Sequence, residues 1–326
     1  GTPEQIERYI PPILDGSESW CQLFSEPGAG SDLAGLQTRA VRDGDEWIVD
    51  GQKVWTSLAV GADLGMLLAR TDPDRPKHSG ITWFAFPMRQ HGVEIRPLTE
   101  MTGRAMFNEV FMDECRVPAS AVIGGVDNGW RVGNTTLMHE RAGLAGAGVM
   151  LPYATAGSGS TEADEPAGSF GGRDDGRRSS VPEGMTTAAW YARLARELDR
   201  ETPVLRDRLV AFHIRSEVNN LLGLRARSGA VPAIGNLGKL AMSEIARMRR
   251  EVGNLAIGAA GMLTGDDAES GPGDGDVQRS TLHSPAPSIY GGTDQVQRNI
   301  LGERFLGLPK EPGPPKDTPF RDLLHN

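Results

Sequence analysis

The hydrophobic pattern changes once along the chain. Up to about residue 127, short apolar runs are bounded by Asp-Gly and Asp-Pro turn signals, which is typical of β-strands. The clearest runs are Trp47–Val49, Gly65–Leu68 and Ile81–Phe86. From Gly129 onward, apolar residues recur with a helical period, which favours an antiparallel helical bundle.

Three long helices are expected in this second part. The pattern predicts them over about Trp130–Tyr153, Thr187–Leu222 and Ile234–Met262. The second should be broken near Pro203, because proline cannot continue a helix. A short helix should follow Thr293, a favourable N-cap residue.

Composition marks two segments that should not join the core. Residues 155–186 are rich in Gly, Ser, Asp and Arg and hold almost no large apolar side chain. Such a segment cannot bury enough surface to offset its ordering entropy, so we expect a flexible insertion. The proline-rich residues 309–326 are expected to be a surface tail.

Composition also limits the class of protein. The 326 residues suffice for one large or two ordinary domains. A net charge of -9 without a Lys/Arg block argues against nucleic-acid binding. Two cysteines, Cys21 and Cys115, suit a reducing compartment, and no apolar run is long enough for a membrane span, so we expect a cytoplasmic protein. Because the chain begins with Gly1 and not Met, we expect a fragment.

Two motifs in the β region carry candidate chemistry. FSEPGAGSDLAG (residues 24–35) can present backbone N–H groups and hydroxyls to a pyrophosphate, although such a glycine-rich loop is by itself often a plain turn. It is neither a Rossmann nor a Walker signature. In GQKVWTS (residues 51–57), Trp55 could stack on a flat heterocycle or be a core residue.

A third motif, SIYGGTDQVQRN, spans residues 288–299. Gly291 and Gly292 permit positive φ and a close approach to a ligand. The first turn of the following helix offers N–H groups to an anion or a carbonyl. Nothing from Gly291 to Thr293 can act as an acid or base, so a base must come from elsewhere.

Four segments in this order, SEPGAGSD, DGQKVWTS, NEVFMDECRVP and IYGGTDQVQRNILGERFLGLP, resemble the acyl-CoA dehydrogenase family of flavoproteins, and in particular its actinobacterial members. The resemblance implies an α+β fold. A middle antiparallel β-domain, a barrel or sandwich, is followed by a C-terminal antiparallel four-helix bundle. The family's N-terminal helical domain is expected to be largely absent here.

The resemblance gives expected domain boundaries. Residues 1–19 would be a remnant of the helical domain, 20–127 the middle domain that contacts FAD and acyl-CoA, 128–308 the bundle with its insertion at 155–186, and 309–326 the tail.

FAD is the cofactor that the resemblance implies. Ser25 would bond the pyrimidine edge, Gly30 and Ser31 would meet the phosphates and the CoA chain, Trp55 would lie against the isoalloxazine ring, and Ser57 would contact N5. Further cofactor contacts are implied for Phe24, Thr293 and Gln295. Apart from the resemblance, Ser25 and Ser57 would be ordinary strand-end hydroxyls.

The chain has glycine, Gly291, at the position where many family members carry the catalytic base. Many family members carry Glu where this chain has Gly291, and a subgroup takes its base instead from a Glu-Arg pair on the first bundle helix, matched here by Glu140 and Arg141. By itself, Glu140 would be a solvated or salt-bridged helix residue. The resemblance makes it the base for the α-proton, with the Gly291 N–H polarising the thioester carbonyl and Arg141 supporting CoA contacts. The product would be a trans-2-enoyl-CoA.

Departures from the family concern the oligomer. The Arg-x-x-Phe-Gly motif that closes the FAD site across a subunit interface is missing, and a Gln-x-x-Gly-Gly segment is degraded at Leu255–Ala259. We expect a homo- or heterotetramer, with an unlike subunit completing the site, and an electron-transfer flavoprotein as electron acceptor. A non-catalytic or partner-dependent subunit and an acyl-CoA oxidase stay open as alternatives, as does the acyl chain. The six histidines show no metal-ligand spacing.

Overall fold

The computed structural model of the chain describes residues 1–146, 187–227 and 234–324. Within them the chain divides into two compact units. The first holds residues 1–136 and 311–324, and the second holds residues 137–146, 187–227 and 234–310. The insertion expected at 155–186 lies outside the described residues, as does the end of the helix expected to reach Tyr153.

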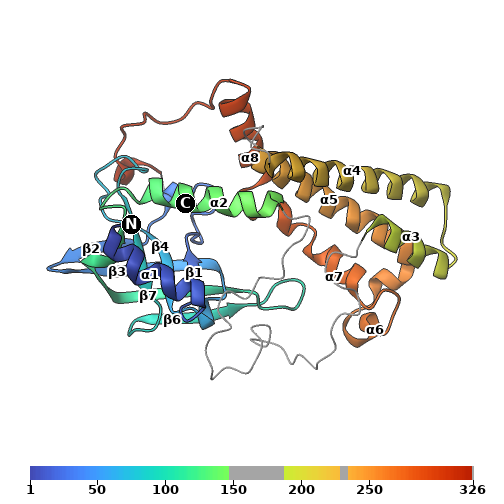
Figure 1. The fold of residues 1–326 in the computed structure, drawn as a ribbon, viewed down its shortest axis with the longest axis horizontal. Coiled ribbons are helices and arrows are strands. Elements are labelled where there is room, and N and C mark those ends of the chain that lie inside the picture. Colours follow the sequence, from blue (N-terminus) through green and yellow to red (C-terminus); the bar gives the residue numbers. More distant parts are fainter. Residues whose placement is uncertain (147–186, 228–233, 325–326) are drawn as a thin grey trace. The chain divides into compact units, whose positions relative to one another are not determined.

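The described strands of the first unit form a single eight-stranded sheet (Figure 1). Seven strands follow the order β6-β7-β3-β2-β4-β5-β8, and β1 pairs with β4 off this path. The strands are β1 (Trp20–Leu23), β2 (Arg39–Asp43), β3 (Glu46–Ser57), β4 (Leu64–Arg70), β5 (Ile81–Pro87), β6 (Val93–Leu98), β7 (Phe107–Pro118) and β8 (Val122–Ile123).

Pairing in this sheet is mainly antiparallel, as expected. The exceptions involve β4, which is parallel to β1 and meets β2 in parallel at the pair Arg39–Arg70. A parallel pair needs a long crossover connection, and the β2–β3 hairpin lies within the connection from β1 to β4. The predicted β region is therefore confirmed.

Strands β4 and β5 are buried on both faces of the sheet. Nearly every residue of β4 and β5 is buried, and Leu67, Leu68 and Phe84 are fully inaccessible. This explains why these strands are continuous apolar runs in the sequence, with no alternation of polar residues. The longer β3 and β7 alternate between buried and more accessible positions, because one face is less covered.

Two helices accompany the first unit. Helix α1 (Pro3–Asp15) begins with a capping box in which Thr2 and Gln5 exchange backbone and side-chain bonds, and it ends at Gly16 with φ 78°. Helix α2 (Gly129–Gly146) starts in the first unit and continues into the second. At its start Gly129 touches the backbone of Thr82, so close that an added Cβ would lie 2.4 Å from the carbonyl carbon.

The second unit is helical. Its elements are α3 (Ala188–Glu197), α4 (Pro203–Arg227), α5 (Ile234–Ile257), α6 (Gly265–Glu269), α7 (Asp276–His283), α8 (Asp294–Ile300) and a π-helical turn (Leu301–Phe305). Tyr191, Phe212 and Val252 belong to the buried core shared by α3, α4, α5 and α7. The β-domain followed by a helical domain is thus confirmed.

Proline sets the predicted break in this unit. Helices α3 and α4 are separated by residues 198–202, and α4 begins at Pro203, where Thr202 accepts a hydrogen bond from the Leu205 N–H at 3.1 Å. Proline fits the first helical position because its missing N–H would have no partner there.

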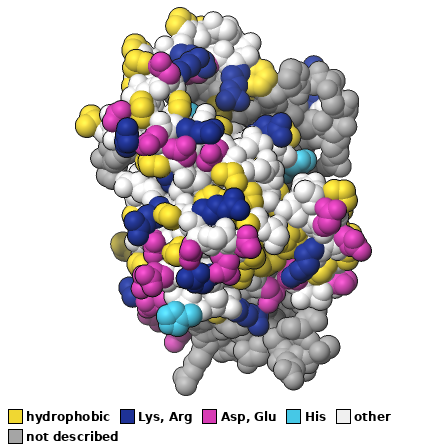
Figure 2. Space-filling model, turned by 90° about the vertical axis from the view of Figure 1, so that its left-hand side faces the viewer, with side chains coloured by type: hydrophobic (Ala, Val, Ile, Leu, Met, Phe, Trp, Pro, Cys, Tyr) yellow, Lys and Arg dark blue, Asp and Glu magenta, His cyan; other side chains and the backbone are white. Residues whose placement is uncertain are grey.

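Charged side chains of both signs lie intermixed with apolar ones over the face shown in Figure 2. None of the described helices has the length and the apolar character that a membrane span requires.

Candidate active site

The expected site residues fall into both units. Those of FSEPGAGSD and GQKVWTS lie in the first unit, and those of SIYGGTDQ lie in the second together with Glu140. Each half has its own geometry.

The glycine-rich loop is hydrogen-bonded to strand β3. The Ser25 carbonyl accepts from the Val54 N–H at 2.9 Å, and the Phe24 carbonyl accepts from Lys53 Nζ at 3.0 Å. Phe24 itself is buried, so its side chain belongs to the core. The half-buried Ser25 is therefore held beside the strand that carries Trp55.

A buried ion pair between Lys53 and Glu26 links this loop to strand β3. Lys53 is fully inaccessible and Glu26 is 8% exposed, and their charged atoms lie 2.8 Å apart. The Glu26 carboxylate also accepts from the N–H groups of Gln37 and Thr38, at 2.7 and 2.9 Å. Burial acts to raise the pKa of Glu26, but Lys53 and these donors outweigh it and hold the pKa below its usual value. Burial in turn lowers the pKa of Lys53.

Trp55 is turned outward by an irregularity in β3. Lys53 pairs with Val110 and Thr56 pairs with Asn108, so β3 has one more residue than β7 between these pairs. This is a β-bulge, and within it Trp55 has φ 62° and is 56% exposed. A large residue with positive φ is strained, and such strain is concentrated at functional sites.

The bulge is held in place from β7. The Asn108 side chain donates to the Thr56 carbonyl at 2.9 Å, and both residues are buried. Phe107 packs edge-on against Trp55, with ring centroids 5.7 Å apart. Trp55 stays 56% exposed despite this contact, and the half-buried Ser57 follows it by two residues, so its indole can accept a flat ring.

The tip of the glycine-rich loop is open. Gly30 and Ser31 are exposed, and the Lys77 ammonium contacts both carboxylate oxygens of Asp32, at 2.8 and 2.9 Å. This pair leaves the backbone N–H groups and the hydroxyl at the tip available to a ligand.

In the second unit, the double glycine forms a left-handed turn before α8. Gly291 has φ 64° and Gly292 has φ 81°, conformations that a residue with a Cβ avoids. Thr293 caps α8 by accepting from the Val296 N–H at 3.2 Å. Gln295 is exposed on the first turn.

Gln297 fixes the Gly291 peptide, and sequence reasoning missed it. This fully buried side chain donates to the Gly291 carbonyl at 2.7 Å and accepts from Asn236 at 2.6 Å. The available signal was its spacing, three residues after Asp294 and hence on the same face of the short helix predicted after Thr293.

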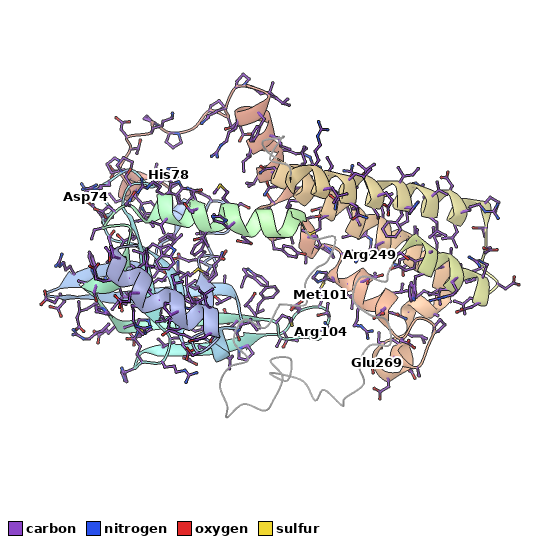
Figure 3. All side chains as sticks on the ribbon, viewed as in Figure 1. Asp74, His78, Met101, Arg104, Arg249 and Glu269 are labelled. Carbon is purple, nitrogen blue, oxygen red and sulfur yellow. The ribbon has the colours of Figure 1, made fainter. Side chains whose placement is uncertain are left out.

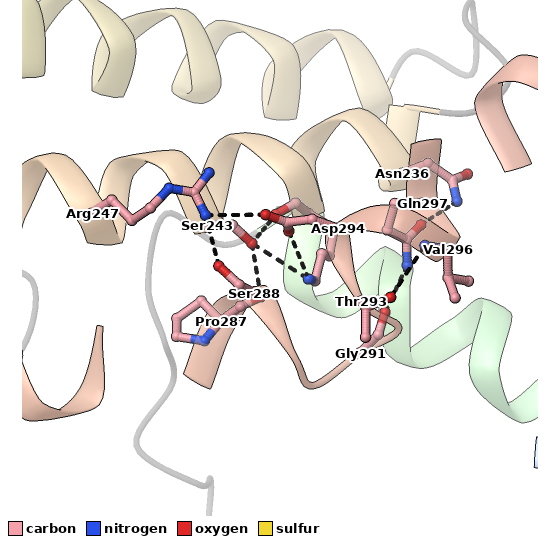
Figure 4. A network of polar contacts seen from close by, with 11 residues as sticks. Asn236, Ser243, Arg247, Pro287, Ser288, Gly291, Thr293, Asp294, Val296 and Gln297 are labelled. Atoms are coloured by element: carbon pink, nitrogen blue, oxygen red, sulfur yellow. Dashed lines mark hydrogen bonds and ion pairs between the residues drawn. The ribbon is translucent and has the colours of Figure 1, made fainter. Parts of the chain in front are cut away.

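A network from α5 holds the ends of the glycine turn (Figure 4). Asp294 pairs with Lys239 at 3.2 Å and with Arg247 at 3.1 Å. The same Arg247 nitrogen donates to the Ser288 hydroxyl at 2.7 Å, so one guanidinium contacts the chain before and after Gly291. Burial acts to raise the pKa of Asp294, but hydrogen bonds, among them those from Arg247 and Lys239, lower it overall.

Glu140 lies on α2 in the second unit and is half-buried, whereas the neighbouring His139 is exposed. Arg141 follows on the same helix, and only its backbone is described. Among the residues that the structure describes, no group of three His, Cys, Asp or Glu side chains could hold a metal ion.

Comparisons with known proteins agree with this arrangement of units. Residues 21–115 match the model of the acyl-CoA dehydrogenase middle domain, and residues 183–306 match that of the acyl-CoA dehydrogenase C-terminal domain. Acyl-CoA dehydrogenase IpdE1 of Mycobacterium tuberculosis is 39% identical over 315 residues, which cover 95% of this chain and 72% of that protein.

Solved structures of the family share the fold. The G363A variant of the Tcur3481-Tcur3483 steroid ACAD has a TM-score of 0.75 at 29% identity, over 95% of this chain and 74% of that one. The ChsE4-ChsE5 complex from Mycobacterium tuberculosis has a TM-score of 0.69 at 28% identity, with the same coverage of 95% and 74%. The chain belongs to the acyl-CoA dehydrogenase family of oxidoreductases, as its motifs predicted.

Proposed function

We propose that the chain carries out the FAD-dependent α,β-dehydrogenation of an acyl-CoA thioester to a trans-2-enoyl-CoA. The observation that carries this proposal is the left-handed Gly291 turn, which has no side chain to act as base, together with a half-buried carboxylate, Glu140, in the same unit.

Glu140 is proposed to remove the α-proton of the thioester. A carboxylate covered by an acyl chain loses water and becomes a stronger base. The Gly291 N–H is proposed to donate to the thioester carbonyl, so that negative charge developing on this oxygen is stabilised. The Gly291 carbonyl is already engaged by Gln297, which fixes the plane of one peptide at this turn. Arg141 is proposed to support CoA binding.

The residues of the first unit fit a flavin. An outward-facing Trp55 offers a flat apolar face. Ser57 follows it by two residues, and Ser25 is held beside the same strand through its carbonyl, so both can offer hydroxyls to a ring edge. Gly30 and Ser31 are proposed to contact the FAD phosphates, and Ser31 also the CoA chain. The backbone of Phe24 is proposed to add a further FAD contact, and Thr293 and Gln295 are proposed to contact FAD from the second unit. When bound, FAD supplies the acceptor for the hydride from the β-carbon.

We further propose that an unlike family member completes the site. The Leu255–Ala259 segment, expected to serve a neighbour's cofactor, is contacted by the chain's own Arg200, which donates to the Leu255 carbonyl at 3.5 Å. Gly258 has φ 57°, and an added Cβ there would lie 2.2 Å from the Arg200 guanidinium carbon. The two solved relatives are each named as a pair of chains, Tcur3481-Tcur3483 and ChsE4-ChsE5, which supports this assembly.

The substrate is proposed to be a large acyl group, with steroid-derived thioesters as first candidates because one solved relative is the Tcur3481-Tcur3483 steroid ACAD. An electron-transfer flavoprotein is the proposed electron acceptor. A cytoplasmic location is proposed because both cysteines are free and buried.

The test is an anaerobic titration with a panel of acyl-CoAs, including steroid-derived ones, while flavin absorbance is followed. Bleaching by one acyl class is expected, and Glu140→Gln should abolish it while retaining the flavin. Glu217→Gln, an exposed glutamate on α4, is the matched control and should bleach normally. Bleaching that survives in Glu140→Gln would refute the base assignment, and rapid reoxidation by air would favour an oxidase.

A further inference from the structure

The C-terminal residues do not extend freely from the first unit. Phe320–Asp322 form a short 3-10 turn that lies against the loop at Pro73–Pro76. The Phe320 N–H donates to the Arg75 carbonyl at 2.9 Å and the Arg321 N–H to the Pro73 carbonyl at 3.1 Å. Asp74, labelled in Figure 3 on this loop, pairs with the Arg321 side chain at 2.7 Å. We call Pro319–Leu323 the C-terminal strap.

Phe320 connects the strap to a buried cation. Its side chain is 6% exposed, and its ring lies 3.7 Å from the guanidinium carbon of Arg70, at the end of β4. Arg70 is 4% exposed, so the aromatic ring replaces water over one face of the charge. Burial lowers the pKa of Arg70 to about 10, which leaves it charged at neutral pH.

The edge of the same guanidinium holds the glycine-rich loop. Arg70 donates to the Ala34 carbonyl at 2.6 Å and to the Leu36 carbonyl at 3.4 Å, just beyond the SEPGAGSD segment. Its other terminal nitrogen donates to the Lys77 carbonyl at 2.6 Å. The Lys77 ammonium in turn contacts both carboxylate oxygens of Asp32. Arg70 therefore supports the loop directly just after Asp32 and, through Lys77, at Asp32 itself.

We propose that the C-terminal strap is a positioning element for the cofactor- and CoA-binding loop, and that Phe320 acts through Arg70 on Gly30 and Ser31. This inference rests on the proposed function, because it assumes that the loop binds FAD phosphates and the CoA chain. Phe320 does not touch either ligand in this scheme. Its part is to keep Arg70 oriented, since a guanidinium without the ring over it can turn toward water and release the loop carbonyls.

The test compares Phe320→Ala with Phe320→Tyr, which keeps a ring over Arg70. The matched control is Arg321→Ala, which removes only exposed ion pairs, the one with Asp74 and a longer one with Asp322. Three quantities are measured in the full protein: the FAD dissociation constant, kcat and KM for the acyl-CoA that bleaches the flavin, and amide hydrogen exchange of residues 30–37 without ligand.

Phe320→Ala should raise the FAD dissociation constant and KM about five- to tenfold, with kcat at saturation changed less than about twofold, and should speed exchange in the loop. Phe320→Tyr and Arg321→Ala should resemble the wild type. A fall in thermal stability with unchanged KM, FAD affinity and loop exchange would overturn the proposal and leave Phe320 as a packing residue only. A wild-type protein that binds neither FAD nor acyl-CoA even in the presence of an unlike acyl-CoA dehydrogenase-family chain would instead refute the proposed function, whatever the exchange data show.

Discussion

The first half of the candidate site depends on the buried ion pair between Lys53 and Glu26, which holds the glycine-rich loop against β3. Removing the lysine leaves a carboxylate in a low-dielectric environment without its cation. We expect Lys53→Met to lower the free energy of unfolding by about 3 kcal/mol, measured by urea denaturation. Lys316→Met, at an exposed position, should change it by less than about 0.5 kcal/mol. Equal effects of the two substitutions would contradict the buried pair.

The same pair makes stability depend on acidity. Because the folded-state pKa of Glu26 lies below its usual value, the folded protein binds fewer protons in acid than the unfolded chain does. The stabilisation is present above about pH 4.3 and is lost as the pH falls through the folded-state pKa. In Glu26→Gln the free energy of unfolding should therefore fall less steeply below about pH 4.3, whereas the exposed Glu7→Gln should follow the wild type. Parallel curves for Glu26→Gln and wild type would refute this.

At this scale, sequence predicted residue types better than their conformations. Ser25 and Trp55 could be proposed because they stand in motifs, but the positive φ of Trp55 depends on the register between β3 and β7. The burial of Lys53 was equally hidden, because a lysine between Gln52 and Val54 has no local sign of a partner 27 residues away.

Helix α2 starts where the backbone of Gly129 touches that of Thr82 and Trp83 in β5. Ala at an interior helix position is usually favoured over Gly by about 1 kcal/mol. At Gly129 an added Cβ would lie 2.5 Å from the Trp83 nitrogen. Gly129→Ala should therefore lower the free energy of unfolding by about 2 kcal/mol, which lowers the melting temperature by several degrees. At Gly133 the nearest atom is a Leu68 methyl at 3.1 Å, which can shift, so Gly133→Ala should cost much less. Similar melting temperatures for the two variants would contradict the close contact at Gly129.

Helix α5 supports the glycine turn through Arg247, which contacts both Ser288 and Asp294. Arg247→Met should free the turn and misdirect the Gly291 N–H, lowering kcat about 10- to 100-fold with little change in bound FAD. Arg208→Met, which breaks an exposed pair between α4 and α5, should leave kcat unchanged. Loss of FAD in parallel with kcat would show a structural defect and refute this positioning role.

The observed ends of helices agree with the predicted ones where a proline or a change of hydrophobic period marks the boundary. Pro203 gave the start of α4 correctly, but α5 ends at Ile257 and not at Met262, with a 3-10 turn at residues 258–262. Gly258 causes this difference, because its φ of 57° does not continue an α-helix. Proline-rich composition likewise gave no sign that Phe320 would be buried, since that depends on a distant arginine.

For the whole molecule, the family and fold were predictable because four separated motifs occur in order, each carrying its own local geometry. The assembly is harder to predict, because it depends on interfaces with other subunits that one chain does not contain. Here Arg200 of the same chain donates to the Leu255 carbonyl and lies close to Gly258, within the degraded motif that is expected to face a neighbour's cofactor.

This contact leads to the last prediction. The protein purified alone should bind less than one FAD per chain, and co-purification with an unlike acyl-CoA dehydrogenase-family chain should raise FAD content and activity together. Light scattering gives the mass of each assembly, and absorbance after flavin release gives the FAD-to-chain ratio. Arg200→Ala serves as the matched variant of this surface and should not by itself restore FAD binding, because the Gln-x-x-Gly-Gly residues would still be missing. A homotetramer with one FAD per chain would refute the unlike partner and show that the chain completes its own site.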